Sequence, residues 1–235
     1  MTTIEDNLQA QRQRVALACQ TAGRDVTAVT LLAVSKTFGA DAVAEAVAVG
    51  QRAFGENYIQ EGVDKILALR ASHPGVALEW HCIGPIQSNK TRLVAEHFDW
   101  VQSVDRLKIA QRLNEQRPEG LPPLQVCLQV NVDGGSNKSG VTPAELPALA
   151  AAVAELPRLT LRGLMCIPEP EPGFEAQRAL FMRCKAVFDD LQRQMGSGVD
   201  TLSMGMSDDL DAAVAAGATM VRVGRGVFGT RPPKG

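Results

Sequence analysis

The sequence predicts an α/β protein in which residues 1–235 form a single (β/α)8 barrel with an extra N-terminal helix. Short apolar runs alternate with helical patterns along the whole chain, which is typical of βα units and a parallel sheet. Eight such runs can be counted, and eight parallel strands with crossover helices take about 250 residues. A length of 235 residues therefore suits one barrel. A doubly wound sheet usually has fewer strands and is the alternative.

The first element is an amphipathic helix at residues 3–22, which Thr2 or Thr3 can cap. It precedes the first strand and has no strand of its own. We therefore expect it to cover the gap between the last strand and the first. Its apolar positions recur at helical spacing: Ile4, Leu8, Val15 and Leu17.

Strands and helices then follow in regular order. The first strand, at residues 29–34, is a continuous apolar run, as expected of a strand buried on both faces. Further strands are expected at 52–55, 77–83, 99–103, 124–130, 159–165, 200–203 and 219–223. Helices are expected at 40–49, 57–71, 87–97, 105–116, 143–155, 174–195 and 207–216. The residues after the last strand are too few and too rich in glycine and proline for a full covering helix.

The composition excludes several classes of protein. The chain has 24 basic and 26 acidic residues, whereas a nucleic-acid or anionic-membrane surface normally needs a basic excess, so we expect neither partner. No apolar run approaches the roughly 18 residues of a membrane helix, and the N-terminus lacks a signal-peptide pattern. Five widely spaced cysteines indicate reduced thiols, and three histidines in separate contexts predict no metal site. Together these features predict a cytoplasmic protein.

Lys36 is the strongest candidate for chemistry. In such barrels the ends of the strands form the active face, and Lys36 is the one lysine of seven that directly follows an apolar strand. A lysine partly desolvated at the barrel mouth has a lowered pKa and can form a Schiff base. The alternative is an ordinary surface lysine at the end of a strand.

Two glycine-bearing turns follow the last two strands, where barrels often hold a phosphate. In the first turn, residues 203–209, Ser207 is placed to cap the next helix, whose N-terminus offers donors to an anion. In the second, residues 223–226, Gly224 and Gly226 let the backbone approach a ligand closely. The alternative is a capped helix and a tight turn without a ligand.

Arg222 lies on the last strand at the same rim. A buried guanidinium is costly unless it is paired, so this side chain needs either a ligand or an internal partner. The alternative to a ligand is a salt bridge to a carboxylate of the barrel.

Six segments together resemble one family, the small pyridoxal-phosphate-binding homeostasis proteins of the YggS/PROSC family. The resemblance runs over nearly the whole chain, and the combination of HxIGxxQxNK with SMGMSxD is specific to it. The segments are AVSKT (33–37), FGENYIQE (54–61), WHCIGPIQSNK (80–90), SVDR (103–106), LSMGMSDD (202–209) and VRVGRGVFG (221–229).

The resemblance implies the barrel of the alanine racemase N-terminal domain, with pyridoxal 5'-phosphate (PLP) bound to Lys36 as a Schiff base. It implies that Ser207 with the backbone of Met206, and the turn of Gly224 and Arg225, hold the phosphate. Arg222 would face the pyridine nitrogen, and two more side chains would lie near the ring: Asn57 and His81.

Two positions depart from the pattern of the family. Members often have a second lysine two residues after the Schiff-base lysine, where this chain has Phe38. The residue after Gly224 is commonly small or hydroxylated, and here it is Arg225. Arg225 can add a charged contact to the phosphate or point outward.

The resemblance favours a cofactor carrier over an enzyme. An arginine beside the pyridine nitrogen weakens the electron sink that PLP catalysis needs. Racemases of this fold take a tyrosine from a second, β-rich domain, and this chain is expected to lack that domain and to be a monomer. We therefore expect a protein of PLP homeostasis that buffers PLP or delivers it to PLP-dependent apoenzymes, with no catalytic residue. Two alternatives are a PLP enzyme with racemase-like side activity on amino acids and a PLP-free barrel, either a Schiff-base aldolase or a binder of phosphate ligands.

Overall fold

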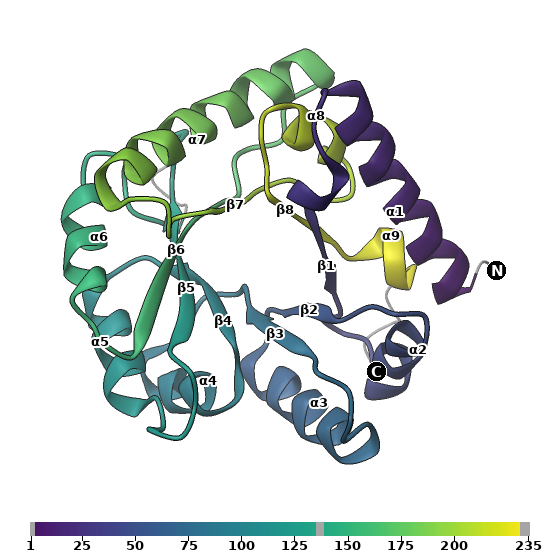
Figure 1. Ribbon diagram of the computed structural model, residues 1–235, viewed down its shortest axis with the longest axis horizontal. Coiled ribbons are helices and arrows are strands. Elements are labelled where there is room, and N and C mark those ends of the chain that lie inside the picture. The colour runs from purple at the N-terminus through teal and green to yellow at the C-terminus, as the bar shows by residue number, and fades with distance from the viewer. Residues whose placement is uncertain (1–2, 135–138, 231–235) are drawn as a thin grey trace.

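The computed structural model describes residues 3–134 and 139–230, which form a closed parallel barrel with an outer ring of helices (Figure 1). The strands neighbour one another in chain order, and β1 pairs with β8 to close the barrel. The (β/α)8 prediction is confirmed. The strands are β1 (Thr30–Val34), β2 (Ala53–Glu56), β3 (Glu79–Cys82), β4 (Trp100–Val104), β5 (Leu124–Val130), β6 (Leu159–Cys166), β7 (Thr201–Ser203) and β8 (Met220–Val223).

Helices follow the strands on the outside of the barrel (Figure 1). Two short 3-10 helices, η1 (Val26–Ala28) and η2 (Ser88–Lys90), precede β1 and α4. The α-helices are α1 (Ile4–Thr21), α2 (Ala40–Ala48), α3 (Ile59–Ser72), α4 (Thr91–His97), α5 (Leu107–Gln116), α6 (Leu146–Ala154), α7 (Phe174–Met195), α8 (Leu210–Ala215) and α9 (Arg225–Phe228).

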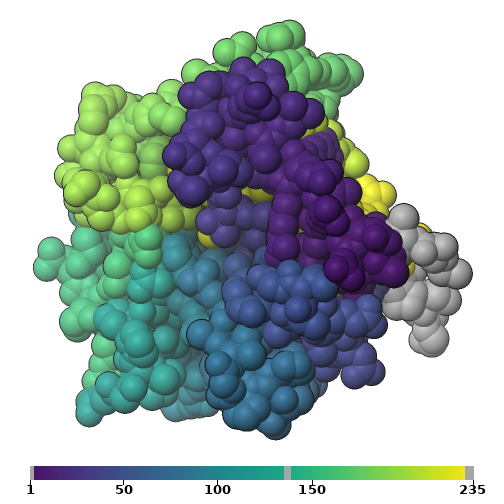
Figure 2. Space-filling model, turned by 45° about the vertical axis from the view of Figure 1, so that its right-hand side comes forward, coloured from purple at the N-terminus to yellow at the C-terminus, as the bar shows by residue number. Residues whose placement is uncertain are grey.

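Helix α1 covers the junction of β8 and β1, as expected. Thr3 caps it by accepting a hydrogen bond from the Asp6 backbone, while the Asp6 carboxylate accepts one from the Thr3 backbone. The helix packs against α8, α9 and α2. In the space-filling view it lies on the surface between the yellow-green C-terminal segments and the blue segments that follow β1 (Figure 2).

The main core lies between the barrel and the helices, with large buried side chains such as Phe54, Trp80 and Phe181. The barrel interior is different, because small apolar groups share it with polar side chains that solvent does not reach. Leu32, Val34, Ile83 and Met220 form one apolar group, and Trp100, Cys127 and Met165 form another. The buried polar side chains of β3, β4, β7 and β8 are His81, Gln102, Ser203 and Arg222.

Two local expectations were wrong. Leu17 is 63% exposed instead of facing the barrel, because helix α1 buries Ala18 and Cys19 at that level. Ser207 does not cap α8; that helix begins three residues later, with Asp209 at the N-cap. After β8 the described residues form no full covering helix, as expected, but only the single helical turn α9, in which Val227 and Phe228 are buried.

The described residues hold neither a membrane-spanning helix nor a cluster of metal-ligating side chains. No helix there has both the length and the apolar character to cross a membrane. Residues 3–134 and 139–230 also contain no group of three or more histidine, cysteine or acidic side chains suited to a metal ion. All five cysteines are buried free thiols.

Candidate functional site

A cavity of about 210 Å³ opens at the rim where the strands end. At about 30 Å³ per water in the liquid, this is space for roughly seven waters. Seven of the eight residues expected from the sequence line it, which brings together residues up to 189 positions apart. The lining residues are Val34, Lys36, Asn57, Ile83, Ile167, Met206, Ser207, Asp208, Arg222, Gly224 and Arg225.

The turn that carries Lys36 is held by a buried charge cluster, formed by Lys65, Glu56 and Glu61. The Lys65 ammonium donates to the Ser35 carbonyl, to Glu56 and to Glu61, each at 2.7 Å. The Thr37 backbone donates to Glu61 at 2.6 Å, so the cluster grips the residues on both sides of Lys36. Thr37 has a φ of 70°, an uncommon conformation for a residue with a side chain, and these contacts hold it there.

Glu56 is the most deeply buried member of this cluster. Burial raises the pKa of its carboxyl, and the Lys65 ammonium counteracts part of that effect. The Ser35 hydroxyl donates to Glu56 Oε1 at 2.5 Å, the oxygen that also accepts from the Lys65 ammonium. Glu56 and Glu61 belong to the motif FGENYIQE (54–61), but nothing in the sequence assigns them a role, and Lys65 lies outside every motif. Their contacts join β1, β2 and α3, and no local pattern signals them.

The first glycine-bearing turn uses one of its expected donors internally. The Met206 backbone N–H donates to the Asp209 carboxylate at 2.6 Å, so it has an internal partner here, and its contact with phosphate stays a prediction. Burial raises the pKa of Asp209. Gly205 is required here, because its φ is 89° and a Cβ would lie 2.4 Å from Ala213 Cβ. Ser207 remains at the cavity wall.

The second turn places Arg225 at the cavity instead of outside it. Its guanidinium donates to Asp208 at 3.0 Å, so the pair joins the two turns across the mouth. Both side chains are well exposed, at 66% and 83%, and an exposed ion pair of this kind contributes little stability. An anion entering the cavity can therefore compete for Arg225 at small cost.

Arg222 forms the floor of the site and is 4% exposed. Its guanidinium donates to the Ser203 hydroxyl at 2.8 Å and to the Cys166 carbonyl at 2.9 Å. Both partners are neutral, in contrast to the salt bridge considered as the alternative. Burial lowers the pKa of Arg222, although a guanidinium keeps its charge at any physiological pH. The cavity thus has a permanent buried cation in its wall.

Asn57 lines this cavity and carries a buried, unsatisfied acceptor. Its Oδ1 is buried and has no hydrogen-bond partner among the described residues. The loop that carries it lies against Gly84, where a Cβ would be 2.3 Å from the Asn57 carbonyl oxygen. Gly84 is therefore needed for the position of Asn57, a dependence between two loops that sequence reasoning missed.

His81 was expected near the ring but does not line the cavity. It is fully buried inside the barrel, where its ring stacks on Trp100 at a centroid distance of 5.0 Å. Its Nε2 contacts Glu79 at 2.8 Å and its Nδ1 contacts Gln102 at 2.9 Å. Ile83 lines the cavity instead; it follows β3, two residues after His81, and so lies nearer the rim where the strand ends.

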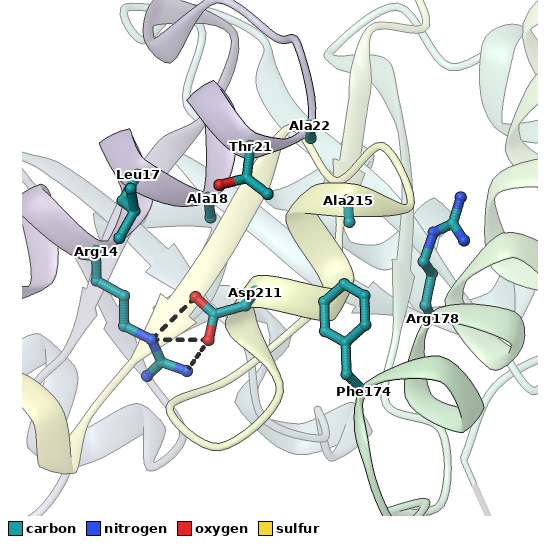
Figure 3. Close-up of a pocket in the computed structure, with 9 residues that line it drawn as sticks. All are labelled: Arg14, Leu17, Ala18, Thr21, Ala22, Phe174, Arg178, Asp211 and Ala215. Carbon is teal, nitrogen blue, oxygen red and sulfur yellow. Dashed lines mark hydrogen bonds and ion pairs between the residues drawn. The ribbon is translucent and has the colours of Figure 1, made fainter.

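A larger groove of about 630 Å³ lies on the outside of the barrel, between α1, α7 and α8 (Figure 3). Arg14 and Asp211 form its polar side, and their guanidinium and carboxylate are 2.6 Å apart. The same guanidinium donates to the Ser207 carbonyl at 2.6 Å. Helix α1 thus supports one residue of the cavity from behind.

Comparisons with known proteins show the family to which the chain belongs. A family model described as the N-terminal domain of alanine racemase matches residues 7–232. A Pseudomonas aeruginosa protein named pyridoxal phosphate homeostasis protein is 59% identical over 231 residues, 98% of this chain and 97% of its own length. An Escherichia coli protein of the same name is 55% identical over 232 residues, 98% of both chains.

The chain belongs to the family of the pyridoxal phosphate homeostasis proteins. Solved structures agree: PipY of Synechococcus elongatus, with PLP bound, has a TM-score of 0.79 and 37% identity, and the match covers 97% of this chain and all of PipY. Alanine racemase from Corynebacterium glutamicum has a TM-score of 0.66 at 19% identity, and the match covers 96% of this chain but 61% of the racemase. The second match shows a shared fold alone.

Phe38, the other departure from the homeostasis-protein pattern, packs away from the cavity. Its ring stacks on Phe228 of α9 at a centroid distance of 5.2 Å. It therefore ties the turn after β1 to the end of the chain, where a lysine could not pack in the same way.

Proposed function

We propose that this chain binds PLP in the rim cavity, holds it on Lys36 as a Schiff base, and buffers it or hands it to PLP-dependent apoenzymes. The observation that carries the proposal is the meeting of Lys36, Arg222 and the two glycine-bearing turns in one cavity. We further propose that residues 1–235 act as one PLP-binding domain, as a monomer in the cytoplasm.

The residues present fit the chemistry of PLP. The Lys36 amine is the nucleophile for an aldehyde; the C=N bond forms as water leaves. The Arg222 guanidinium is a fixed donor for an aromatic nitrogen that carries no proton, and Asn57, which lines the same cavity, carries a buried acceptor. Ser207, Gly224 and Arg225 provide the polar end for a phosphate, together with the Met206 backbone, whose N–H donates to Asp209 here.

The same residues support a carrier over an amino-acid enzyme. When bound, PLP supplies an electron sink, which an arginine at the pyridine nitrogen weakens. A racemase-like activity also needs an acid or base at the substrate carbon. Tyr58 is 53% exposed and is not a lining residue of the cavity. The thiols are buried, and burial raises the pKa of Cys82 and of Cys127 to about 12.

Ser207→Ala should weaken PLP retention by about 1–3 kcal/mol, because a charge-assisted hydrogen bond to the phosphate is lost. The dissociation rate of PLP, followed by absorbance after dilution into a PLP scavenger, measures the effect. Ser72→Ala is the control, since its hydroxyl donates to the Ala68 carbonyl within α3 and Ser72 is not a lining residue. Equal PLP retention in Ser207→Ala and the wild type would reject Ser207 as a phosphate ligand.

Arg14→Leu should speed PLP dissociation by about three- to ten-fold, since the support behind Ser207 is lost. Arg12→Leu is the control on the same helix, because Arg12 donates to the Val49 carbonyl and Gln51 on the other side of α1. Both variants are expected to lower thermal stability slightly, and only Arg14→Leu should change the rate. The same rate in both variants would show that Arg14 does not act through Ser207.

Two assays of the purified protein separate the candidate functions. A carrier gains a yellow absorbance band with PLP and then restores the activity of a PLP-dependent apoenzyme that is added in equal amount. Steady turnover of any amino acid, lost in Lys36→Ala, would establish the enzyme instead. A colourless protein after incubation with PLP would favour a PLP-free barrel.

A further inference from the structure

A continuous chain of hydrogen bonds runs through the barrel interior from the cavity to the opposite end. Arg222 donates to Ser203 Oγ at 2.8 Å, and Ser203 donates to Gln102 Oε1 at 2.7 Å. Gln102 Nε2 then contacts His81 Nδ1 at 2.9 Å, and His81 Nε2 contacts Glu79 at 2.8 Å. The chain links a buried cation at the cavity to a carboxylate at the first residue of β3.

The chemistry of the two ends, together with the contact of Gln102 Nε2 to the Met220 sulfur, gives one direction for every hydrogen bond between them. A guanidinium can only donate, so Ser203 accepts from it and turns its own proton to Gln102 Oε1. The amide nitrogen of Gln102 therefore faces His81, whose Nδ1 must be the acceptor. The His81 proton then lies on Nε2 and is donated to the Glu79 carboxylate, which can only accept.

Other contacts hold the central members in the same arrangement. Gln102 Nε2 also lies 3.1 Å from the sulfur of Met220, an acceptor that the amide oxygen could not use. His81 is fixed by its stack on Trp100. A second proton on His81 would set two donors against each other at Gln102, so the chain accommodates only the neutral imidazole.

A barrel interior of this kind is normally filled by branched apolar side chains. Here His81, Gln102 and Ser203 have at most 4% exposure, and each would be costly if one of its partners were lost. The side chains contribute nothing to the cavity lining themselves, since only Arg222 reaches it. What the three side chains share is the line of hydrogen bonds that ends at Arg222.

We infer that Gln102 and His81 are positioning residues for Arg222, acting through Ser203 and anchored on Glu79. This inference rests on the proposed function, in which Arg222 faces the bound PLP. The chain holds the guanidinium at one place and keeps its donors directed, so the cavity is preorganised before the cofactor enters.

The first test uses the protein without PLP and reads the protonation of the His81 ring by long-range ¹H–¹⁵N NMR at pH 7. We expect a proton on Nε2 and none on Nδ1 in the wild type. Gln102→Glu replaces the donor at Nδ1 by a carboxylate, and His81 should become doubly protonated. A proton on Nδ1 in the wild type, or an unchanged neutral ring in Gln102→Glu, overturns the inferred chain.

The second test measures the dissociation rate of PLP. Gln102→Met keeps the volume but removes the acceptor for Ser203, so the rate should rise about three- to ten-fold. Gln102→Glu keeps that acceptor and should stay within about two-fold of the wild type. The control is Gln129→Met on β5, a buried glutamine that contacts the Ser139 carbonyl.

The results separate this inference from the proposed function. A wild type that binds no PLP contradicts the proposed function. The NMR test still decides whether the hydrogen bonds from Arg222 to Glu79 are arranged as inferred. A wild type that binds PLP, with Gln102→Met matching Gln129→Met, contradicts the positioning role alone. If Gln102→Met does not fold, Ser203→Ala removes the same link to Arg222, and a PLP dissociation rate equal to that of the wild type contradicts the positioning role.

Discussion

Replacing Lys36 by alanine should abolish the yellow absorbance band that we expect after incubation with PLP. The variant loses the amine that forms the Schiff base, and PLP is then held only by its polar contacts. We expect PLP to dissociate at least about 100-fold faster, which corresponds to about 3 kcal/mol. Absorbance after gel filtration measures both the band and the retained PLP.

Lys108→Ala is the matched control for this prediction, because Lys108 is an exposed lysine of α5. It should keep the band and the retention of the wild type. Urea unfolding without PLP checks that Lys36→Ala still folds cooperatively, so that a lost band reports the missing amine. An undiminished band in Lys36→Ala would show that another lysine carries the cofactor.

Lys65→Met should destabilise the protein by about 3–5 kcal/mol, because it leaves the buried Glu56 carboxylate without its cation. Urea unfolding of the protein without PLP measures the loss. Lys185→Met is the control: Lys185 pairs with Asp189 on α7, its side chain is 31% exposed, and such a pair contributes at most about 1 kcal/mol. Equal losses in the two variants would contradict a buried cluster beneath Lys36.

The loss in Lys65→Met should also depend on pH. Burial already raises the pKa of Glu56, and removing Lys65 raises it further because the ammonium favours the ionised form. A carboxyl whose pKa is raised by folding stabilises the protein fully below its unfolded-state pKa, and that stability is lost as pH rises through the folded-state pKa. The difference between Lys65→Met and the wild type should therefore grow from pH 5 to pH 7.

The barrel could be predicted because its strands have a local signal. The run at 124–130 coincides with β5, and the run at 29–34 begins one residue before β1, since strands buried on both faces are continuously apolar. Residues at strand ends must share a rim in a parallel barrel, so Lys36, Ser207 and Arg222 could be assigned to one site. The expectation that Leu17 faces the barrel was wrong, because helical spacing alone does not show which apolar residues face inward.

The support beneath the site had no local signal. Lys65 binds the Ser35 carbonyl 30 residues away, and Ser203 binds Gln102 across 101 residues. His81 looked like a ring contact because its strand leads to the cavity, but it lies deeper in the barrel than Ile83, and a motif does not show depth along a strand. The Met206 backbone is occupied by Asp209, three residues later, a turn geometry that the motif does not specify.

The central claim, that Lys36 holds PLP in this cavity, is tested most directly by trapping the linkage. Borohydride reduction of the PLP-loaded protein converts the C=N bond into a stable C–N bond, and peptide mass mapping then locates the modified lysine. We predict one pyridoxyl group per chain, on the peptide that contains Lys36. A pyridoxyl group on another lysine, or none in a protein that retains PLP, would contradict the assignment.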